Sequence, residues 1–495
     1  MSCRIEDPSP GGQLLSLPAW IPGSYLIRDF ARHVVQFTAE SGGNEITFHK
    51  VDKHTWRVAP VSGALLVRMT VYAADRSVRG AWLDSQHGFF NGVCLFLRIL
   101  GHDYAPSVVH IDPPDWISSS AEDATTRTNW RISTGLQRLT GGQGEFGAFR
   151  AESYADLIDH PVLMGNLTTV EFLASGVPHA LVLCGLNDPE RDRLQADLAR
   201  LCAWHIDFFG PPVPLKRYAF LTRVSMDGHG GLEHRKSSVL GCRRDEVPRV
   251  GVPTDESGYR RFLGLVSHEY FHAWHVKRIR PAEFVDADPG TEAYTRQLWI
   301  FEGVTSYYDD LALRRCGLIT IEQYLDVLGR SLTRLYRTAG RRYQTLEEAS
   351  FDAWIKFYRP DENTPNATVS YYLKGALVAL ALDLEMRSRT AGTCSLDAVM
   401  RTLWQEYGAD DSPGLPQGQF ERIAEQLSGL DLDGFFEQAL RSTVDPPLGI
   451  LLAQFGIRLN LRSAESETDK GGCRGRREER VRAWLGIRCK QEGVA

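Results

Sequence analysis

The chain has 495 residues, a formal net charge of −6 and a pI of about 6.2, with 43% hydrophobic and 24% charged residues. This balance is typical of a soluble globular protein, and it excludes a bulk electrostatic argument for binding nucleic acid or an anionic membrane. The length predicts about two to four domains.

The N-terminal stretch MSCRIEDPSPGG lacks the apolar core of a signal peptide. The nine cysteines are scattered and form no CxxC pair, which favours a reducing compartment over a disulfide framework or a cysteine zinc site. The longest apolar runs, such as residues 376–382, are too short to span a bilayer. We therefore expect a cytoplasmic protein without a membrane segment.

Residues 1–165 are expected to form a β domain. The stretch LLVRMTVYA at 65–73 alternates between two sets of side chains with a period of two, as a half-buried strand does. Turn-forming residues such as SGG at 41–43 separate runs of this kind. A β-sandwich-like domain is the simplest arrangement for such strands.

From residue 166 the chain mixes strand and helix patterns. Strand patterns occupy residues 168–174, 179–185 and 217–224, and helical spacing occupies residues 192–210. A glycine-rich turn, DGHGGLEH, follows at 227–234. These patterns predict a mixed α+β region.

Helical patterns dominate after residue 258. The stretch 321–340 is expected to be a helix that ends at Gly340, with one apolar face formed by Ile321, Leu325, Leu328, Leu332 and Leu335. The stretch YYLKGALVALALDLEMRSR at 371–389 is apolar nearly all round, which predicts a buried helix. Beyond residue 444 the chain becomes short-stranded and charged, and residues 463–480 are expected to be a solvated loop.

The sequence HEYFH at 268–272 carries the clearest chemical signal. On a helix, His268 and His272 differ by about 40° around the axis and about 6 Å along it, so both imidazoles can reach one metal ion. Glu269 lies beside them, where it can address a metal-bound water. This is the arrangement of a zinc hydrolase with a glutamate general base. The alternative is a surface helix with two partnered histidines.

A catalytic zinc ion needs a third protein ligand. One class of zinc proteases uses a histidine six residues after the second, but Arg278 stands there, six residues after His272. His275 is interpreted as a residue that contacts the metal ligands without binding the metal, or as a structural residue. Glu302, in an aromatic helical segment, is the better candidate because an acid there would be costly to bury without a cation. A salt bridge from Glu302 to Lys277 or Arg278 is the alternative.

HEYFHAWHVKRIRP, followed by WIFEGVTSYY, resembles the M61 glycyl aminopeptidase family, a gluzincin relative of thermolysin and the M1 aminopeptidases. LPAWIPGSYLIRDFARHV at 17–34 is similar to the family's W-x-PGSY signature. GGLEH at 230–234 and SYYLKGALVALALDLEMR at 370–387 are also family-like. The resemblance covers most of the chain, with its motifs in family order.

The resemblance implies an α+β multidomain protein in three parts. A β-sandwich-like domain would occupy residues 1–165, and a thermolysin-like catalytic domain with a mixed sheet lobe and a helical lobe would occupy residues 166–443. A partial PDZ-like domain would occupy residues 444–495, with PLGILLAQFGIRLNL and RAWLGIRCKQEGVA as its opening strands.

The resemblance also implies roles for the site residues. Zinc would be held by His268, His272 and Glu302. Glu269 would be the general base, and Tyr372 would donate a hydrogen bond to the oxyanion, a placement that is worth several kcal/mol in a site of this kind. Tyr371 is the adjacent alternative, and a purely structural core tyrosine is the other.

GGLEH would lie on a strand at the edge of the cleft, with Glu233 paired to the free α-ammonium group of a peptide. Gly230 and Gly231 would let the substrate approach the backbone closely. The alternative is a plain turn with a solvated Glu–His pair.

The predicted function is therefore a zinc-dependent aminopeptidase that acts on peptides with a free N-terminus. A preference for glycine or alanine as the first residue comes from the family resemblance. A zinc endopeptidase, a small-molecule hydrolase on the same scaffold and a non-catalytic peptide-binding scaffold are the alternatives. The joint presence of ligands, base and oxyanion donor argues against the last. No nucleic acid or membrane partner is expected.

Overall fold

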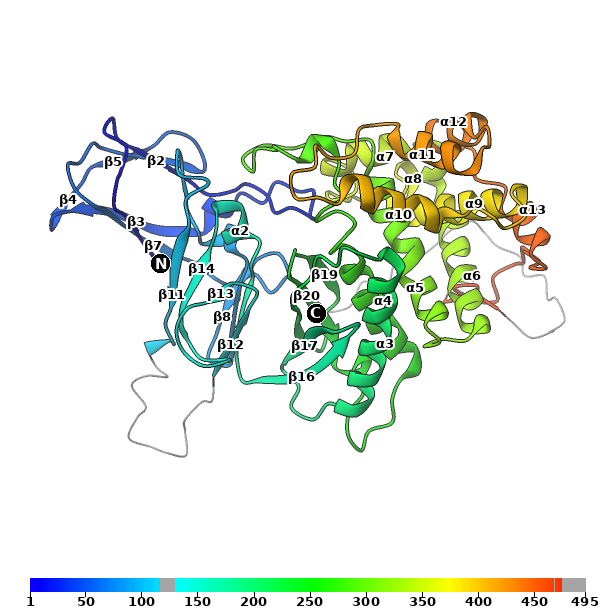
Figure 1. The fold of residues 1–495 in the computed structure, drawn as a ribbon, viewed down its shortest axis with the longest axis horizontal. Coiled ribbons are helices and arrows are strands. Elements are labelled where there is room, and N and C mark those ends of the chain that lie inside the picture. Colours follow the sequence, from blue (N-terminus) through cyan, green and yellow to red (C-terminus); the bar gives the residue numbers. More distant parts are fainter. Residues whose placement is uncertain (116–129, 467, 474–495) are drawn as a thin grey trace.

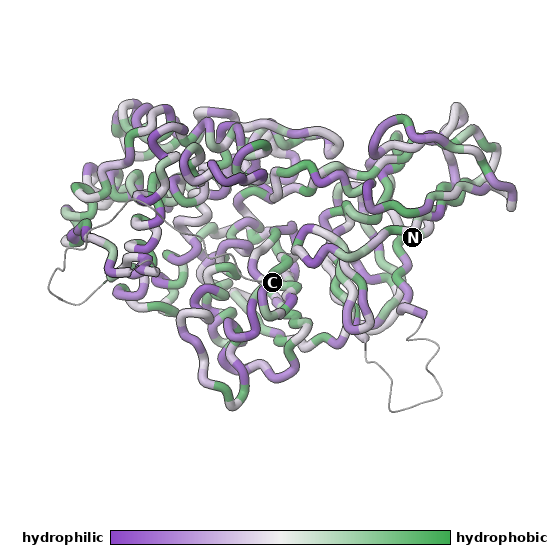
Figure 2. The backbone as a smooth tube through the Cα atoms, turned by 180° about the vertical axis from the view of Figure 1, so that it is seen from behind, coloured by the Kyte–Doolittle hydropathy of each residue, from purple (hydrophilic) through white to green (hydrophobic). Residues whose placement is uncertain are grey.

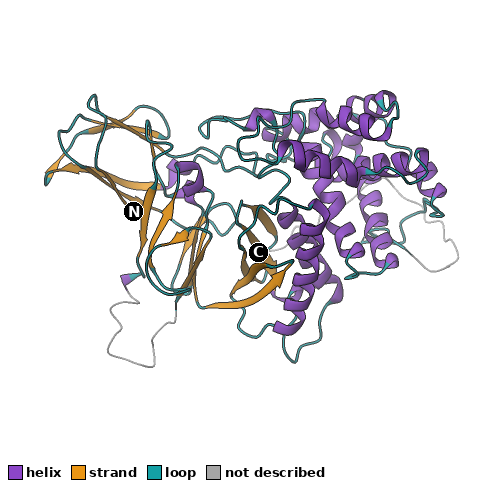
Figure 3. Ribbon diagram, viewed as in Figure 1, coloured by secondary structure: helices purple, strands orange, loops and turns teal. Residues whose placement is uncertain are grey.

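The structure is a computed structural model that describes residues 1–115, 130–466 and 468–473. A β part lies beside a part that combines one sheet with many helices (Figure 1; Figure 3). This arrangement confirms the predicted multidomain α+β architecture with an N-terminal β domain and a helical region. The eight cysteines among the described residues are free thiols, and the cytoplasmic location stays a prediction.

The first half of the β part is a pair of four-stranded sheets around a shared core. The sheets have the orders β1 (Ser2–Ile5), β7 (Leu65–Val71), β3 (Val34–Ser41), β4 (Asn44–Glu45), and β10 (Arg98–Ile99), β2 (Gln13–Ser16), β6 (Thr55–Val58), β5 (Phe48–Lys50). The predicted alternation in β7 is confirmed, because Leu65, Val67 and Met69 are buried while Arg68 and Thr70 are exposed. Trp56 of the facing sheet belongs to the same core.

The second half of the β part is a further pair of sheets with its own core. Their orders are β11 (Ser107–Ile111), β14 (Gly147–Ala151), β13 (Gln137–Arg138), and β12 (Arg131–Thr134), β15 (Val162–Gly165), β9 (His87–Phe90), β8 (Ala81–Leu83). The short helices of the β part are η1 (Phe30–His33), η2 (Gly92–Cys94) and α2 (Tyr154–Ile158).

A five-stranded sheet joins the β part to the helices. Its order is β16 (Leu167–Ala174), β17 (Val177–Cys184), β18 (Tyr218–Ser225), β20 (Ser237–Arg243), β19 (Gly230–Glu233). One face shares a core with α3 (Arg191–Phe209) and α4 (Glu256–Phe271), and the opposite face packs against the β part. Because β19 is the edge strand, one of its sides is left open towards the functional site.

The remaining helices form the other half of the molecule. They are η3 (Arg244–Glu246), η4 (Ala282–Phe284), η5 (Trp299–Val304), α5 (Thr305–Arg315), α6 (Ile321–Arg337), η6 (Ala339–Arg342), α7 (Leu346–Phe351), η7 (Asp352–Trp354), α8 (Thr364–Ala367), α9 (Tyr371–Arg389), α10 (Leu396–Tyr407), α11 (Gln419–Ser428), α12 (Asp433–Arg441) and α13 (Leu448–Gln454). Hydrophobic and hydrophilic stretches alternate along them (Figure 2), as in amphipathic helices around a core.

Helix α9 occupies the predicted bounds and is buried, as expected. The stretch Thr364–Arg389 that contains it is long and apolar enough to cross a membrane, and 67% of its most apolar window is buried inside the protein. A core helix passes the same test of length and composition, so this stretch is weak evidence for a membrane span.

Two sequence-based expectations about the helices are wrong in detail. Helix α6 ends at Arg337 rather than at Gly340, because Thr338 leaves the helical conformation with ψ 107° and Gly340 lies in η6. The apolar face of α6 is also incomplete, since Ile321 is 43% exposed.

The first expected PDZ-like strand is also wrong. PLGILLAQ contains helix α13, whose Leu448, Leu451 and Leu452 recur at helical spacing and are buried in the main core. The second expected strand, RAWLGIRCKQEGVA, lies outside the described residues. The described part of the chain therefore contains no strand after residue 444.

The N-terminal segment around the WIPGSY sequence packs into the helical part. Trp20 and Tyr25 belong to the large core of that part. The indole Nε1 of Trp20 donates to the carbonyl of Asp288 at 3.3 Å, and Ala19 N donates to the carbonyl of Pro289 at 2.7 Å. The loop at 281–295 thus holds this segment, which brings Tyr25 to the functional site.

Candidate metal centre and active site

Three side chains converge on one point: His268 from α4, His272 from the C-cap of α4 and Glu302 from η5. The Nε2 atoms of His268 and His272 lie 3.1 Å apart, and Oε2 of Glu302 lies 3.3 Å from His272 Nε2 and 3.7 Å from His268 Nε2. Ligand atoms in a tetrahedral zinc site lie about 3.3 Å apart. The three side chains therefore fit a single metal ion of this size.

The two histidines are held so that their Nε2 atoms point at this site. His272 Nδ1 donates to the carbonyl of His275 at 2.7 Å, and His268 Nδ1 donates to Oδ2 of Asp309 on α5 at 3.3 Å. Such contacts set the tautomer that offers Nε2 to a metal. The ring of His275 instead contacts Thr305 and stacks on Phe301, which agrees with its structural interpretation.

Glu302 is 2% exposed and has two kinds of partner. Besides the histidines, the hydroxyl of Tyr25 donates to its Oε1 at 3.3 Å. Burial opposes its ionisation, but the neighbouring histidines hold the pKa of Glu302 at about 2. The alternative salt bridge is wrong, because Lys277 pairs with Asp159 at 2.6 Å and Arg278 donates to backbone carbonyls.

A close crossing of η5 and α9 brings Tyr372 to the centre. A Cβ atom on Gly303 would lie 2.6 Å from the Cα of Gly375, so the two backbones pack directly against each other. The ring of Tyr372 then lies 6.2 Å from that of His268, and its hydroxyl lies 3.1 Å from that of Tyr358. Tyr371 is fully buried, whereas Tyr372 is partly buried, and the ring contact with His268 favours Tyr372 over Tyr371 as the site tyrosine.

Two further acids lie beside these three candidate ligands. Glu269 and Glu233 are 5% and 3% exposed, and together with His272 they offer ligand atoms within 4.8 Å of one another. Glu269 Oε2 and Glu233 Oε1 have no hydrogen-bond partner among the described residues. Burial raises the pKa of Glu233 to about 7. Buried carboxylates without partners are costly, so this pair favours a cationic or hydrogen-bond-donating ligand.

Glycines make room for both acids. A Cβ atom on Gly231 would clash with the carboxylate of Glu269, and one on Gly23 would clash with the carboxylate of Glu233. Gly230 has a φ of 134°, which a side chain would strain, but no atom lies close to it. Of the two predicted glycines, Gly231 therefore contacts the site and Gly230 shapes the strand.

A Gly231→Ala variant is expected to lose about 10²-fold in turnover, because the new methyl group must displace the Glu269 carboxylate by roughly 1 Å. Steady-state kinetics with a peptide substrate measure the effect. Gly241→Ala on the neighbouring strand is the matched control, since its Cβ would meet only Val78 at 3.6 Å and backbone atoms at no less than 3.7 Å. Equal activity of the two variants would contradict the contact between Gly231 and Glu269.

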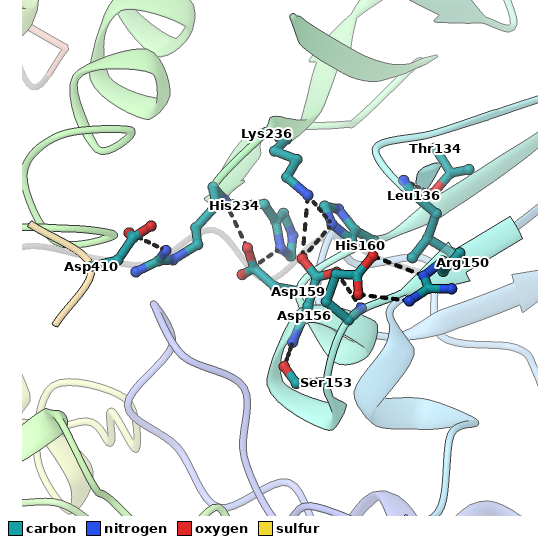
Figure 4. A network of polar contacts seen from close by, with 12 residues as sticks. Thr134, Leu136, Arg150, Ser153, Asp156, Asp159, His160, His234, Lys236 and Asp410 are labelled. Atoms are coloured by element: carbon teal, nitrogen blue, oxygen red, sulfur yellow. Dashed lines mark hydrogen bonds and ion pairs between the residues drawn. The ribbon is translucent and has the colours of Figure 1, made fainter. Parts of the chain in front are cut away.

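The strand that carries Glu233 is fastened to the β part by an ionic network (Figure 4). Asp159 accepts from Arg235 N at 2.8 Å and lies 3.4 Å from Nδ1 of His234. Asp156 similarly pairs with Lys236 at 3.3 Å and with His160 at 3.1 Å. Asp159 also pairs with Lys277, five residues after His272. This network fixes the end of β19 relative to α4.

Three residues at the site were not identified from the sequence. Tyr25 lies within the quoted PGSY motif, so a signal for it was present. Tyr358, beside Tyr372, and Arg79, whose Nη2 donates to the carbonyl of Gly231 at 3.4 Å, stand in no recognisable motif. Both come from loops that are distant in sequence from HEYFH.

Two stretches of the chain match family models. Residues 261–378 match the family model for M61 glycyl aminopeptidase, and residues 1–166 match that for the peptidase M61 N-terminal domain. No curated protein matches the chain.

Solved structures add a near relative and several distant ones. An aminopeptidase N family protein from Idiomarina loihiensis is 39% identical, with a TM-score of 0.91 over 96% of this chain and 78% of that one. An M1 zinc metallopeptidase mutant from Deinococcus radiodurans, bound to a Tyr-Ser-Ala substrate, is 13% identical, with a TM-score of 0.49 over 90% of each chain.

Proposed function

The chain belongs to the M61 glycyl aminopeptidase family and is a metallopeptidase, and from this premise we propose that it is a zinc-dependent aminopeptidase. It would release the first residue from peptides with a free N-terminus. The observation that carries this proposal is Glu233, a buried carboxylate without a partner for Oε1 among the described residues, grouped with Glu269 and His272.

The zinc ion would be held by His268, His272 and Glu302, and when bound it would activate a water molecule and polarise the scissile carbonyl. Glu269 is the general base: its free Oε2 accepts the proton from the attacking water and passes it to the leaving amine. Tyr372 donates its hydroxyl hydrogen to the oxyanion, and Tyr358 at 3.1 Å orients that hydroxyl.

Glu233 sets the exopeptidase mode. An ionised carboxylate at this position binds the α-ammonium group, which holds the first peptide bond beside Glu269. The endopeptidase alternative requires Glu233 to face away from the cleft, and its position with Glu269 and His272 favours the aminopeptidase.

The preference for glycine or alanine rests on family membership and has one structural support. Gly23 of the PGSY loop lies directly against the Glu233 carboxylate. The loop therefore occupies space beside the proposed ammonium site, which leaves less room for a large first side chain.

Amino-acid release from matched free and N-acetylated peptides tests the proposal. Each peptide begins with Gly, Ala, Leu or Arg and is incubated with and without a zinc chelator. We expect cleavage of free peptides only, fastest for Gly and Ala, and loss of activity on chelation. Internal cleavage of acetylated peptides would contradict the role of Glu233, and chelator-resistant cleavage would contradict the metal.

A further inference from the structure

Two arginines of the β part bond to segments that contact the proposed active site. Arg79, in the loop before β8, donates from Nη2 to the carbonyl of Gly231, the residue that lies directly against the Glu269 carboxylate. Arg28, in the segment that follows PGSY, donates from Nη2 to Oγ of Ser24 at 2.8 Å. Both side chains are available to a ligand only in part, because the segments around them cover their Nε atoms.

Neither arginine has an acidic partner among the described residues. Within those residues neither forms an ion pair, and the Nε atom of each is buried without a hydrogen-bond partner. Asp75 interacts with Arg28 only through longer-range attraction. Guanidinium groups that are partly removed from water are normally paired with carboxylates or carbonyls. Both guanidinium groups therefore keep N–H donors that no described residue accepts from.

The two positive charges also act on each other, and that of Arg79 acts on the reacting groups. Burial lowers the pKa of Arg28, and the charge of Arg79 lowers it further. The charge of Arg79 also acts on Glu269 and on Tyr358. Two neighbouring cations repel each other unless an anion lies between them, so the arrangement favours an anionic ligand next to the scissile bond.

The length of β19 sets the size of that ligand. Gly231, whose carbonyl accepts from Arg79, and Glu233 are two residues apart on the strand, a separation of about 7 Å. An extended dipeptide spans about 7 Å from its amino group to its carboxylate. A dipeptide anchored by its ammonium group at Glu233 would therefore bring its carboxylate to the guanidinium of Arg79.

We propose that Arg79, supported by Arg28, binds the C-terminal carboxylate of the substrate and that the preferred substrate is a dipeptide. This proposal rests on the proposed aminopeptidase function and specifies the substrate class of the same site. The guanidinium of Arg79 donates two parallel N–H hydrogen bonds to the carboxylate, and Arg28 adds a second positive charge near Arg79. Glu233 and Arg79 then hold the two ends of the dipeptide, with its peptide bond between them at Glu269.

The test compares Gly-Ala with its C-terminal amide, which lacks the negative charge. The full chain loaded with zinc is expected to show a kcat/KM for the acid that is about 10- to 100-fold higher than for the amide. In Arg79→Gln this ratio should fall towards one. In Arg79→Lys it should be intermediate, because lysine keeps the positive charge but cannot make the two parallel hydrogen bonds of a guanidinium group. Lengthening the peptide to Gly-Ala-Ala-Ala should also reduce the ratio.

Arg76→Gln is the matched control, because Arg76 lies in the same loop, is exposed and packs over Trp82 at 4.0 Å. Its acid-to-amide ratio should equal that of the unaltered protein. Arg28→Gln provides a second variant in case Arg79→Gln fails to fold, and its ratio should fall as well.

Equal cleavage of acid and amide by the unaltered protein would overturn the proposed carboxylate site but would still agree with the proposed aminopeptidase function. A ratio that survives in both Arg79→Gln and Arg28→Gln would overturn it too. Absence of any cleavage would overturn the proposed function together with this site.

Discussion

A Glu269→Gln variant is expected to lose turnover by about 10²- to 10⁴-fold while it keeps its metal. Glutamine has the same shape as glutamate but cannot accept the proton of the attacking water. The three side chains proposed to hold the metal are untouched, and Oε2 of Glu269 makes no hydrogen bond within the described residues that the change would break. Steady-state kinetics measure the loss of kcat, and atomic spectroscopy measures whether the variant keeps its zinc.

Glu256→Gln is the matched control for this experiment. Glu256 opens the same helix, but its side chain is 63% exposed and pairs with Arg193 at the surface. Its loss should leave both turnover and zinc content near those of the unaltered protein. If Glu269→Gln retained full turnover, the base would have to be another group, and if it lost its zinc, Glu269 would be acting on the metal rather than on water.

The grouping of His268, His272 and Glu302 could be predicted from the sequence because its geometry is mostly local. His268 lies in the last turn of α4 and His272 follows as its C-cap in helical conformation, so their spacing alone places both imidazoles on one face. Glu302 required one further argument, the cost of burying an acid among aromatic side chains, and its 2% exposure agrees with that argument. The roles of these residues in catalysis stay proposals until the variants are measured.

Contacts across the molecule could not be predicted in this way. Tyr25 and Glu302 are 277 residues apart, and Arg79 reaches Gly231 across 152 residues. A hydrophobic period reports which face of an element is buried, but not which distant loop covers it. Helix α13 illustrates a different error: its leucines recur at helical spacing, but the family resemblance suggested a strand.

A Glu233→Gln variant is expected to lower kcat/KM for Gly-Ala by about 10²- to 10³-fold, because it removes the charge that pairs with the α-ammonium group. The amide keeps the shape of the side chain against Gly23, so the PGSY loop can stay in place. Kinetics with Gly-Ala measure the effect. The N-acetylated form, which the unaltered protein is expected not to cleave, should stay uncleaved by the variant.

This pattern separates an ammonium anchor from a structural acid. If Glu233 served only to hold β19, its loss would lower the melting temperature together with the rate. Glu171→Gln, on the opposite edge strand of the same sheet, is the matched control, because Glu171 is exposed and accepts a hydrogen bond from Gln143 at the surface. A fall in kcat/KM for Gly-Ala at an unchanged melting temperature would assign Glu233 to substrate binding. A fall that comes with a lowered melting temperature would make Glu233 a structural residue and remove the basis for exopeptidase specificity.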